Sequence, residues 1–175
     1  MAAREHTIGP ADGRLLIRTG RSGLGRRAGH DLVLEATRWS GTVTEGDREP
    51  PAGTSAEVRV EVEGIRVREG TGGVLPLSDQ DRAEIVKNLR RVLRADRHPE
   101  IVFRSTETTA DRAAGELTIM GRTEPVVLDL EVADDRARGV AVIRQTAWGI
   151  KPFSAMFGAL RLADEVRVEF ELTPS

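Results

Sequence analysis

The chain has 175 residues, a length that suits one domain covering residues 1–175. Its 26 basic and 28 acidic residues give a net charge of −2, which excludes a bulk polycation and disfavours nucleic acid as a partner. With no cysteine, it has neither disulfides nor thiolate metal ligands, and a domain of this size can bury a sufficient core without them.

The first residues carry no targeting or membrane signal. Their longest apolar run is 15–17, whereas a secretory signal needs about 7–15 apolar residues and a membrane-spanning helix about 20. We therefore expect no transmembrane segment and a cytoplasmic protein.

The first half of the chain alternates apolar and polar residues with the period of two that is typical of β-strands. The pattern predicts a short strand over "RLLIRT" and longer ones over 32–43 and 56–67. The apolar phase of the second strand changes near Thr37, and that of the third changes after Gly64. Both changes predict β-bulges.

One stretch, "SDQDRAEIVKNLRRVLRADRHP", predicts a helix. Ser78 suits the N-cap, Asp81 can complete a capping box, and Pro99 prevents continuation. The apolar residues recur on one stripe: Ile85, Val86, Leu89, Val92 and Leu93. Acidic residues precede basic ones, which favours the helix dipole, and we interpret the basic face as solvated rather than as a binding patch.

Two alternating runs follow, with "GRTEP" between them, and together they predict a hairpin over 115–132. Their apolar set lies on one face: Leu117, Ile119, Val126, Leu128, Leu130 and Val132. Further strands are predicted over "PEIVFRST", "GVAVIRQTAWG" and "VRVEFEL". Alternation alone leaves open whether the apolar face meets a packed core or a cavity.

These elements make a mainly β protein of about eight antiparallel strands, each with one wet and one dry face. A single helix cannot cover such a sheet, whereas closing the sheet on itself removes its exposed edges. The pattern therefore favours an extended, lipocalin-like β-barrel with one α-helix packed at its side or mouth. A two-sheet sandwich is the alternative.

Candidate chemistry is sparse. The histidines, His6, His30 and His98, share no metal-ligand spacing, and no catalytic or nucleotide-binding motif occurs. We therefore predict no catalytic residues, no metal and no cofactor apart from a bound lipid. His6 is expected to lie before the first strand.

The segment "RTGRSGLGRRAGHD" combines arginines with glycines. Backbone N–H groups and guanidinium groups both suit a phosphate, so Arg26, Arg27 and His30 are candidates for holding a lipid head group. The alternative is a solvated connection between two strands.

Several of these segments resemble the signature of the YceI-like family. The resemblance covers roughly residues 10–173 and is most specific in "RADRHPEIVFRST" and "GELTIMGRTEPVVLDLEV". It rests on Pro99, Ile101, Phe103, Ser105, Gly115, Leu117, Ile119, Gly121, Thr123, Pro125, Val126 and Leu128. "GHDLVLEATRWSGTV", "IRQTAWGIKPF" and "LADEVRVEFEL" also resemble family segments.

The resemblance implies a lipocalin-like barrel whose apolar lumen holds a polyisoprenoid chain, such as a prenyl phosphate or an isoprenoid quinone tail. Dimers are common in such families, so the resemblance also makes a homodimer an alternative to a monomer. Many relatives are exported, whereas this sequence shows no such signal.

The residue pattern supplies a candidate lumen lining: Phe103, Leu117, Ile119, Leu128, Leu130, Val142, Trp148, Phe153, Met156 and Phe157. The last three are expected to plug the mouth of the barrel, or else to pack a loop onto it. Two other functions stay open. One is an interaction or dimerisation module with a filled barrel, and the other is an enzyme that acts on a lipid.

Overall fold

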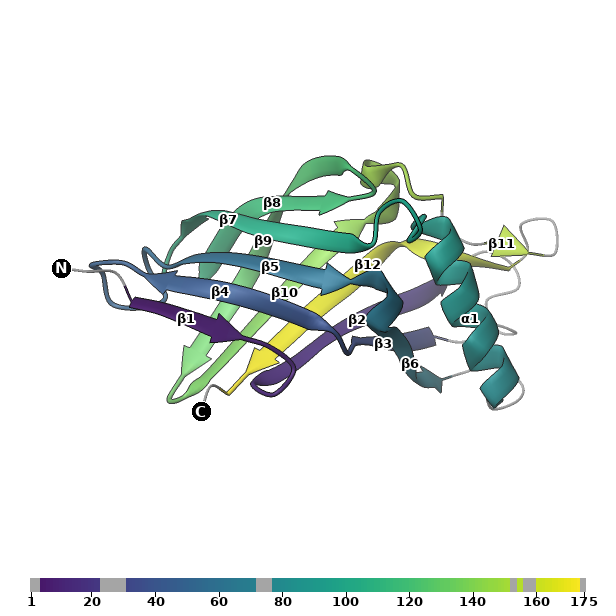
Figure 1. The fold of residues 1–175 in the computed structure, drawn as a ribbon, viewed down its shortest axis with the longest axis horizontal. Helices are drawn as coiled ribbons and strands as arrows, with labels where there is room; N and C mark the ends of the chain where they lie inside the picture. The colour runs from purple at the N-terminus through teal and green to yellow at the C-terminus, as the bar shows by residue number, and fades with distance from the viewer. Residues whose placement is uncertain (1–3, 23–30, 72–76, 152–153, 156–159, 174–175) are drawn as a thin grey trace.

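The computed structural model describes residues 4–22, 31–71, 77–151, 154–155 and 160–173 (Figure 1). Its elements are β1 (Arg4–Ile8), β2 (Gly13–Ser22), β3 (Asp31–Ala36), β4 (Trp39–Glu45), β5 (Ser55–Glu61), η1 (Val62–Gly64), β6 (Ile65–Thr71), α1 (Asp79–Val92), β7 (Glu100–Thr108), β8 (Arg112–Ile119), β9 (Arg122–Ala133), β10 (Arg136–Arg144), η2 (Gln145–Trp148), β11 (Ser154–Ala155) and β12 (Leu160–Leu172).

The strands form one curled antiparallel sheet, a half-barrel with α1 at one end (Figure 1). Neighbours follow the order β1-β4-β5-β7-β8-β9-β10-β12-β2-β3-β6, and β11 pairs with β12. The expectation of a mainly β, lipocalin-like fold with one helix is confirmed. Among the described residues the sheet has 12 strands rather than about eight. The difference arises because two predicted strands each divide, and because β1 and β11 were not predicted.

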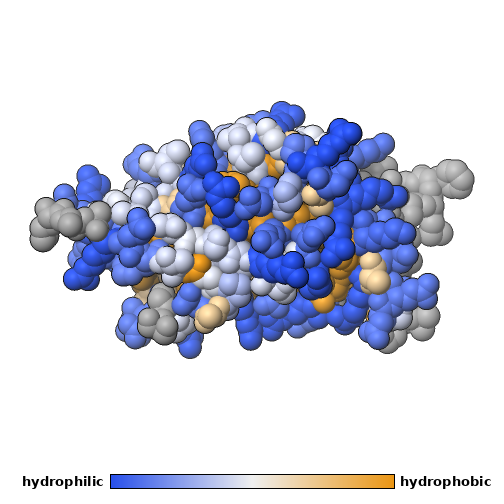
Figure 2. All heavy atoms as spheres, viewed as in Figure 1, coloured by the Kyte–Doolittle hydropathy of each residue, from blue (hydrophilic) through white to orange (hydrophobic). Residues whose placement is uncertain are grey.

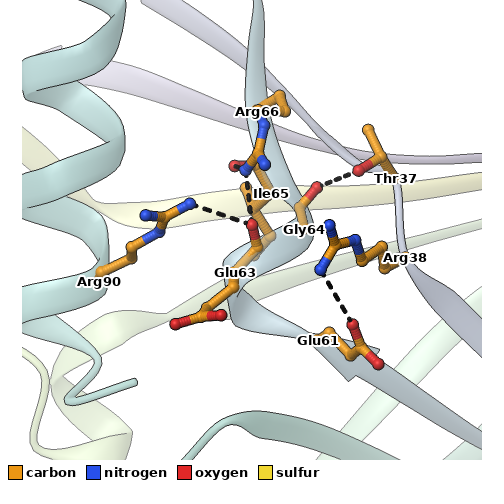
Figure 3. Close-up of polar contacts among 8 residues, drawn as sticks. All are labelled: Thr37, Arg38, Glu61, Glu63, Gly64, Ile65, Arg66 and Arg90. Atoms are coloured by element: carbon orange, nitrogen blue, oxygen red, sulfur yellow. Dashed lines mark hydrogen bonds and ion pairs between the residues drawn. The ribbon is translucent and has the colours of Figure 1, made fainter. Parts of the chain in front are cut away.

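The divided strands bend sharply where phase changes predicted bulges. β3 ends at Ala36 and β4 begins at Trp39, opposite the 3-10 turn η1 between β5 and β6. The Thr37 amide and hydroxyl both donate to the Gly64 carbonyl (Figure 3). A Cβ at Gly64 would lie 2.7 Å from the Arg38 Cβ, so the two bends touch closely. The regular pairing stops between Ala36–Ile65 and Trp39–Val60, so β3 and β6 lie at one end of the strand order while β4 and β5 lie towards the other.

His6 lies in β1, paired with β4 opposite Val43, and not outside the sheet as expected. Its Nε2 lies 3.6 Å from Glu45 Oε1. The segment "REHTI" has only one buried residue, Ile8, so the apolar alternation on which the prediction relied is absent there. Pairing with β4 supplies the strand instead.

The helix begins as predicted. Ser78 Oγ accepts a hydrogen bond from the Asp81 amide at 3.1 Å, and Asp81 Oδ2 accepts one from the Ser78 amide at 3.0 Å, which completes the capping box. Arginines link the helix to its neighbours. Arg82 donates to the Val67 carbonyl, and Arg90 donates to the Glu63 carbonyl, as Figure 3 shows. The helix therefore sits fixed across β6 and η1.

The hairpin of β8 and β9 also forms as predicted, with a shorter turn. Met120 (φ 54°) and Gly121 (φ 75°) make a two-residue connection with positive φ at both positions, the geometry that matches the twist of paired strands. Arg122 already belongs to β9, so most of "GRTEP" is strand rather than turn. This register carries the apolar residues of both strands to the inner face.

Candidate ligand-binding cavity

A cavity of ≈ 1060 Å³ lies inside the curled sheet and beneath α1. Its volume is at the upper limit of the roughly 300–1,000 Å³ typical of small-molecule sites. The lining on β12 runs from Val166 to Leu172 by alternate residues, a length of ~20 Å at the rise of a β-strand. The outer face in Figure 2 is mostly hydrophilic, with hydrophobic residues visible chiefly in recesses. The cavity is therefore long, and the face of the protein seen in Figure 2 is mostly polar.

Five of the predicted lumen residues line this cavity: Phe103, Leu117, Ile119, Leu128 and Leu130. The rest of the hairpin's apolar set lines it too, because alternate side chains of a strand share one face. Val168 and Phe170 of β12 complete this part of the wall. The apolar alternation therefore marked the inner face correctly on β7, β8, β9 and β12.

Val142 does not face the cavity, and its prediction as a lumen residue is wrong. Its side chain is 60% exposed, whereas Ala141 and Ile143 on either side are buried and line the cavity. Both phases of "GVAVIR" carry apolar residues, so alternation could not choose between them. Pairing with β12, which places Ala141 opposite Val168, settles the register.

Trp148 is buried (4% exposed) but does not belong to the cavity lining. Its Nε1–H donates to the Leu117 carbonyl at 2.8 Å, which holds η2 against β8. The indole ring packs in the hydrophobic core next to the cavity. Its predicted place in the lumen is corrected to a packing role. A buried tryptophan needs such an acceptor, and the sequence alone does not supply its identity.

The turn η2 is also tied to β12. Asp164 accepts hydrogen bonds from Thr146, from Oγ1 at 2.7 Å and from the amide at 2.9 Å. The side-chain hydrogen bond, followed by the backbone one and the nearby charge of Arg144, holds the pKa of the Asp164 carboxyl below its ordinary value. The ionised carboxylate therefore stabilises this junction.

The remaining predicted site residues lie outside the described part of the chain. These are Phe153, Met156 and Phe157 of the predicted plug, and Arg26, Arg27 and His30 of the predicted head-group site. Both roles stay predictions.

The structure adds lining residues that were not predicted as such. The apolar stripe of α1 and its C-cap contributes Ile85, Leu89, Val92 and Leu93. Of the two predicted positions, the side or the mouth of the barrel, the helix therefore takes the one over the lumen. Trp39 of β4 also lines the cavity, and among the described residues its Nε1–H has no hydrogen-bond partner. The helical stripe was visible in the sequence, but which surface it covers depends on the fold.

Few lining side chains carry charge. Among the lining residues that the structure describes, Glu5, Asp12 and Glu45 are acidic, and none is lysine or arginine. Glu45 ends β4, at the end of the sheet far from α1 (Figure 1). Within the described residues, no group of three histidine or carboxylate side chains is placed to hold a metal ion. This wall suits an apolar molecule better than an anion.

A curled antiparallel sheet with a long apolar interior and a covering helix defines a lipocalin-like binding fold. The chain belongs to the YceI-like family, since the model of the YceI-like domain matches residues 21–173. The resemblance inferred from the sequence is thereby confirmed. No helix among the described residues has the length and apolar character needed to cross a bilayer.

Two solved structures share the fold. Burkholderia cenocepacia BcnA is 17% identical, with a TM-score of 0.59 over 90% of this chain and 94% of that chain. A mutant CJ YCEI protein, solved with a monobromobimane guest, is 11% identical, with a TM-score of 0.55 over 79% of this chain and 81% of that chain. No curated protein matches this chain by sequence.

Proposed function

We propose that this protein binds a long, apolar, isoprenoid-type lipid in its lumen and sequesters or carries it without chemical change. The observation that carries the proposal is the cavity of ≈ 1060 Å³ with its aliphatic wall. A flexible branched chain gains dispersion contacts along such a wall, and each buried CH₂ contributes ~0.8 kcal/mol. A few isoprene units therefore offset the entropy lost on binding.

The charge of the wall favours a neutral head group, such as a quinone or an alcohol, over a phosphate. The acidic lining residues would repel a phosphate, and the described lining offers no cation to pair with it. The arginine segment remains the one candidate for phosphate binding. If it holds a head group, Arg26→Ala with Arg27→Ala weakens binding of a prenyl phosphate and leaves a neutral prenol unaffected. Equal losses for both lipids, or none, would remove that role.

The other two candidate functions have less support. A filled interaction module does not need a cavity of this size. For an enzyme, the nearest arrangement is His6 with Glu45, which line the cavity. They lie 3.6 Å apart, and the His6 side chain is more than half exposed. The described hydrogen bonds do not join His6 to a serine or threonine, so no described contact supports a nucleophile–base pair at this position.

The test is retention of lipid. Protein expressed in bacteria and analysed by native mass spectrometry should carry an extractable apolar molecule. Stripping with organic solvent should lower the melting temperature, and adding a prenol should restore it. A ligand at 100 times its dissociation constant adds about 2.7 kcal/mol, which corresponds to roughly 5–10 °C for a chain of this length.

A matched pair of variants locates the site. Ala141→Phe places a ring in the lumen, and Val142→Phe places the same ring on the outer face one residue along β10. We expect the first to lose lipid and the second to keep it, with circular dichroism as the check on folding. If solvent stripping leaves the melting temperature unchanged and both variants contain the same amount of lipid, the protein does not carry lipid in this cavity.

A further inference from the structure

The Phe170 ring packs against a glycine in the wall of the cavity. Gly139 is the direct partner of Phe170 across β10 and β12, and its neighbours on the inner face, Ala137 and Ala141, line the cavity. A Cβ added at Gly139 would lie 2.0 Å from Cε1 and 2.5 Å from Cζ of the Phe170 ring. The ring therefore occupies the space that any other residue at position 139 would fill.

A second phenylalanine, Phe103, packs against a glycine in the same way on the other side of β9. Gly115 lies on the inner face of β8 between Ala113 and Leu117, and a Cβ there would lie 2.5 Å from the Phe103 Cε2. In the sheet, β9 runs between β8 and β10. Phe103 of β7 and Phe170 of β12 are thus both recessed over glycines, and these glycines lie on β8 and β10, the two strands that flank β9.

Recessing the rings sets the width of the lumen. A Cβ at position 139 would push the Phe170 ring off the backbone, and because the sheet itself lies behind the ring, the ring would move into the cavity. An isoprenoid carries a methyl branch on every fourth carbon of its chain, so it needs a wider channel than a straight acyl chain of the same length. A narrower lumen would therefore penalise the branched chain first.

We infer that Gly139 and Gly115, by recessing Phe170 and Phe103, are the specificity-determining residues that let the lumen accept a methyl-branched chain. This inference rests on the proposed lipid-binding function. Gly139 gives the cleaner test, because its three closest contacts are all atoms of the Phe170 ring. A Cβ at Gly115 would also lie 2.5 Å from the Arg104 carbonyl oxygen, so that substitution would move the backbone.

The experiment compares a prenol with a straight-chain alcohol of equal carbon number, each titrated into stripped protein by calorimetry. Gly139→Ala should weaken prenol binding by about tenfold or more, the effect of one methylene in a hydrophobic pocket, and change binding of the straight chain much less. Adding Phe170→Leu to Gly139→Ala removes the displaced ring and should restore the prenol. Gly20→Ala on β2 is the control, since among the described residues its Cβ would meet only Ala163 Cβ, at 3.8 Å.

The outcomes separate this inference from the function on which it rests. A native protein that binds neither alcohol overturns the lipid-binding function itself. If the native protein binds the prenol, equal losses for both alcohols in Gly139→Ala, or failure of the double variant to recover, overturn the role of Gly139. If Gly139→Ala does not fold, Ala137→Leu narrows the lumen two residues along β10, on the same inner face. Selective loss of the prenol then supports the inference, and unchanged preference overturns it.

Discussion

Replacing Leu128 by aspartate tests directly whether the inner face of β9 is an apolar interior. Leu128 lies opposite Ala113 and lines the cavity. Its neighbour Val127 points outward and is 48% exposed. Leu128→Asp and Val127→Asp therefore place the same carboxylate on opposite faces of one strand, one residue apart.

The expected loss of stability has two parts. Full burial of a leucine is worth about 1.5–3 kcal/mol, and Leu128 is half-buried, so its removal costs on the order of 1–2 kcal/mol. A carboxylate among the aliphatic lining has a raised pKa, and a rise of two units corresponds to ~2.7 kcal/mol. The sum is about 4 kcal/mol for Leu128→Asp at pH 7, whereas Val127→Asp should cost no more than about 1 kcal/mol.

The part due to charge depends on pH. Since the folded pKa of the new aspartate lies above its unfolded value of about 3.9, its charge destabilises the fold increasingly as pH rises from there to the folded pKa, and fully above it. Leu128→Asn has nearly the same shape without the charge, so the difference in unfolding free energy between Leu128→Asp and Leu128→Asn isolates this term. It should be large at pH 7 and small at pH 4.

The measurement is urea unfolding followed by circular dichroism and by the fluorescence of the two tryptophans. A loss for Leu128→Asp as small as that for Val127→Asp would place Leu128 in contact with water. A difference between Leu128→Asp and Leu128→Asn that does not change with pH would refute the argument from burial of charge.

Two further predictions concern the turn η2. Trp148→Phe removes the hydrogen bond to the Leu117 carbonyl and should cost about 1–3 kcal/mol of unfolding free energy. Trp39→Phe removes an N–H for which the described part of the chain offers no partner, so it should cost less. Equal losses of the two variants in urea unfolding would contradict the role of the Trp148 hydrogen bond. Asp164→Asn should destabilise the protein at pH 7. Because the folded protein lowers the pKa of Asp164, the carboxylate stabilises the fold fully at pH values above its ordinary pKa of 3.8. This stabilisation is lost as the pH falls through the lowered pKa. The gap in melting temperature between native protein and variant should therefore shrink on acidification, and a gap that widens would contradict it.

The sequence by itself determined the fold class, the family, the capped helix and the inner face of the hairpin. These follow from local rules. Apolar residues on one face of a strand must be buried, as Leu117 and Leu128 show, and Ser78 and Asp81 satisfy the free amides of the first helical turn within four residues. The same rules failed at Val142, where both faces of the strand carry apolar side chains.

Only the tertiary structure decided that the interior is a cavity. An alternating strand looks the same whether its inner side chains meet one another or surround an open lumen. That choice depends on contacts between residues distant in the chain, such as the Phe170 ring recessed over Gly139 and the helix laid across the sheet. Local propensity does not encode such contacts, because the space available to a side chain is set by what the rest of the fold places opposite it.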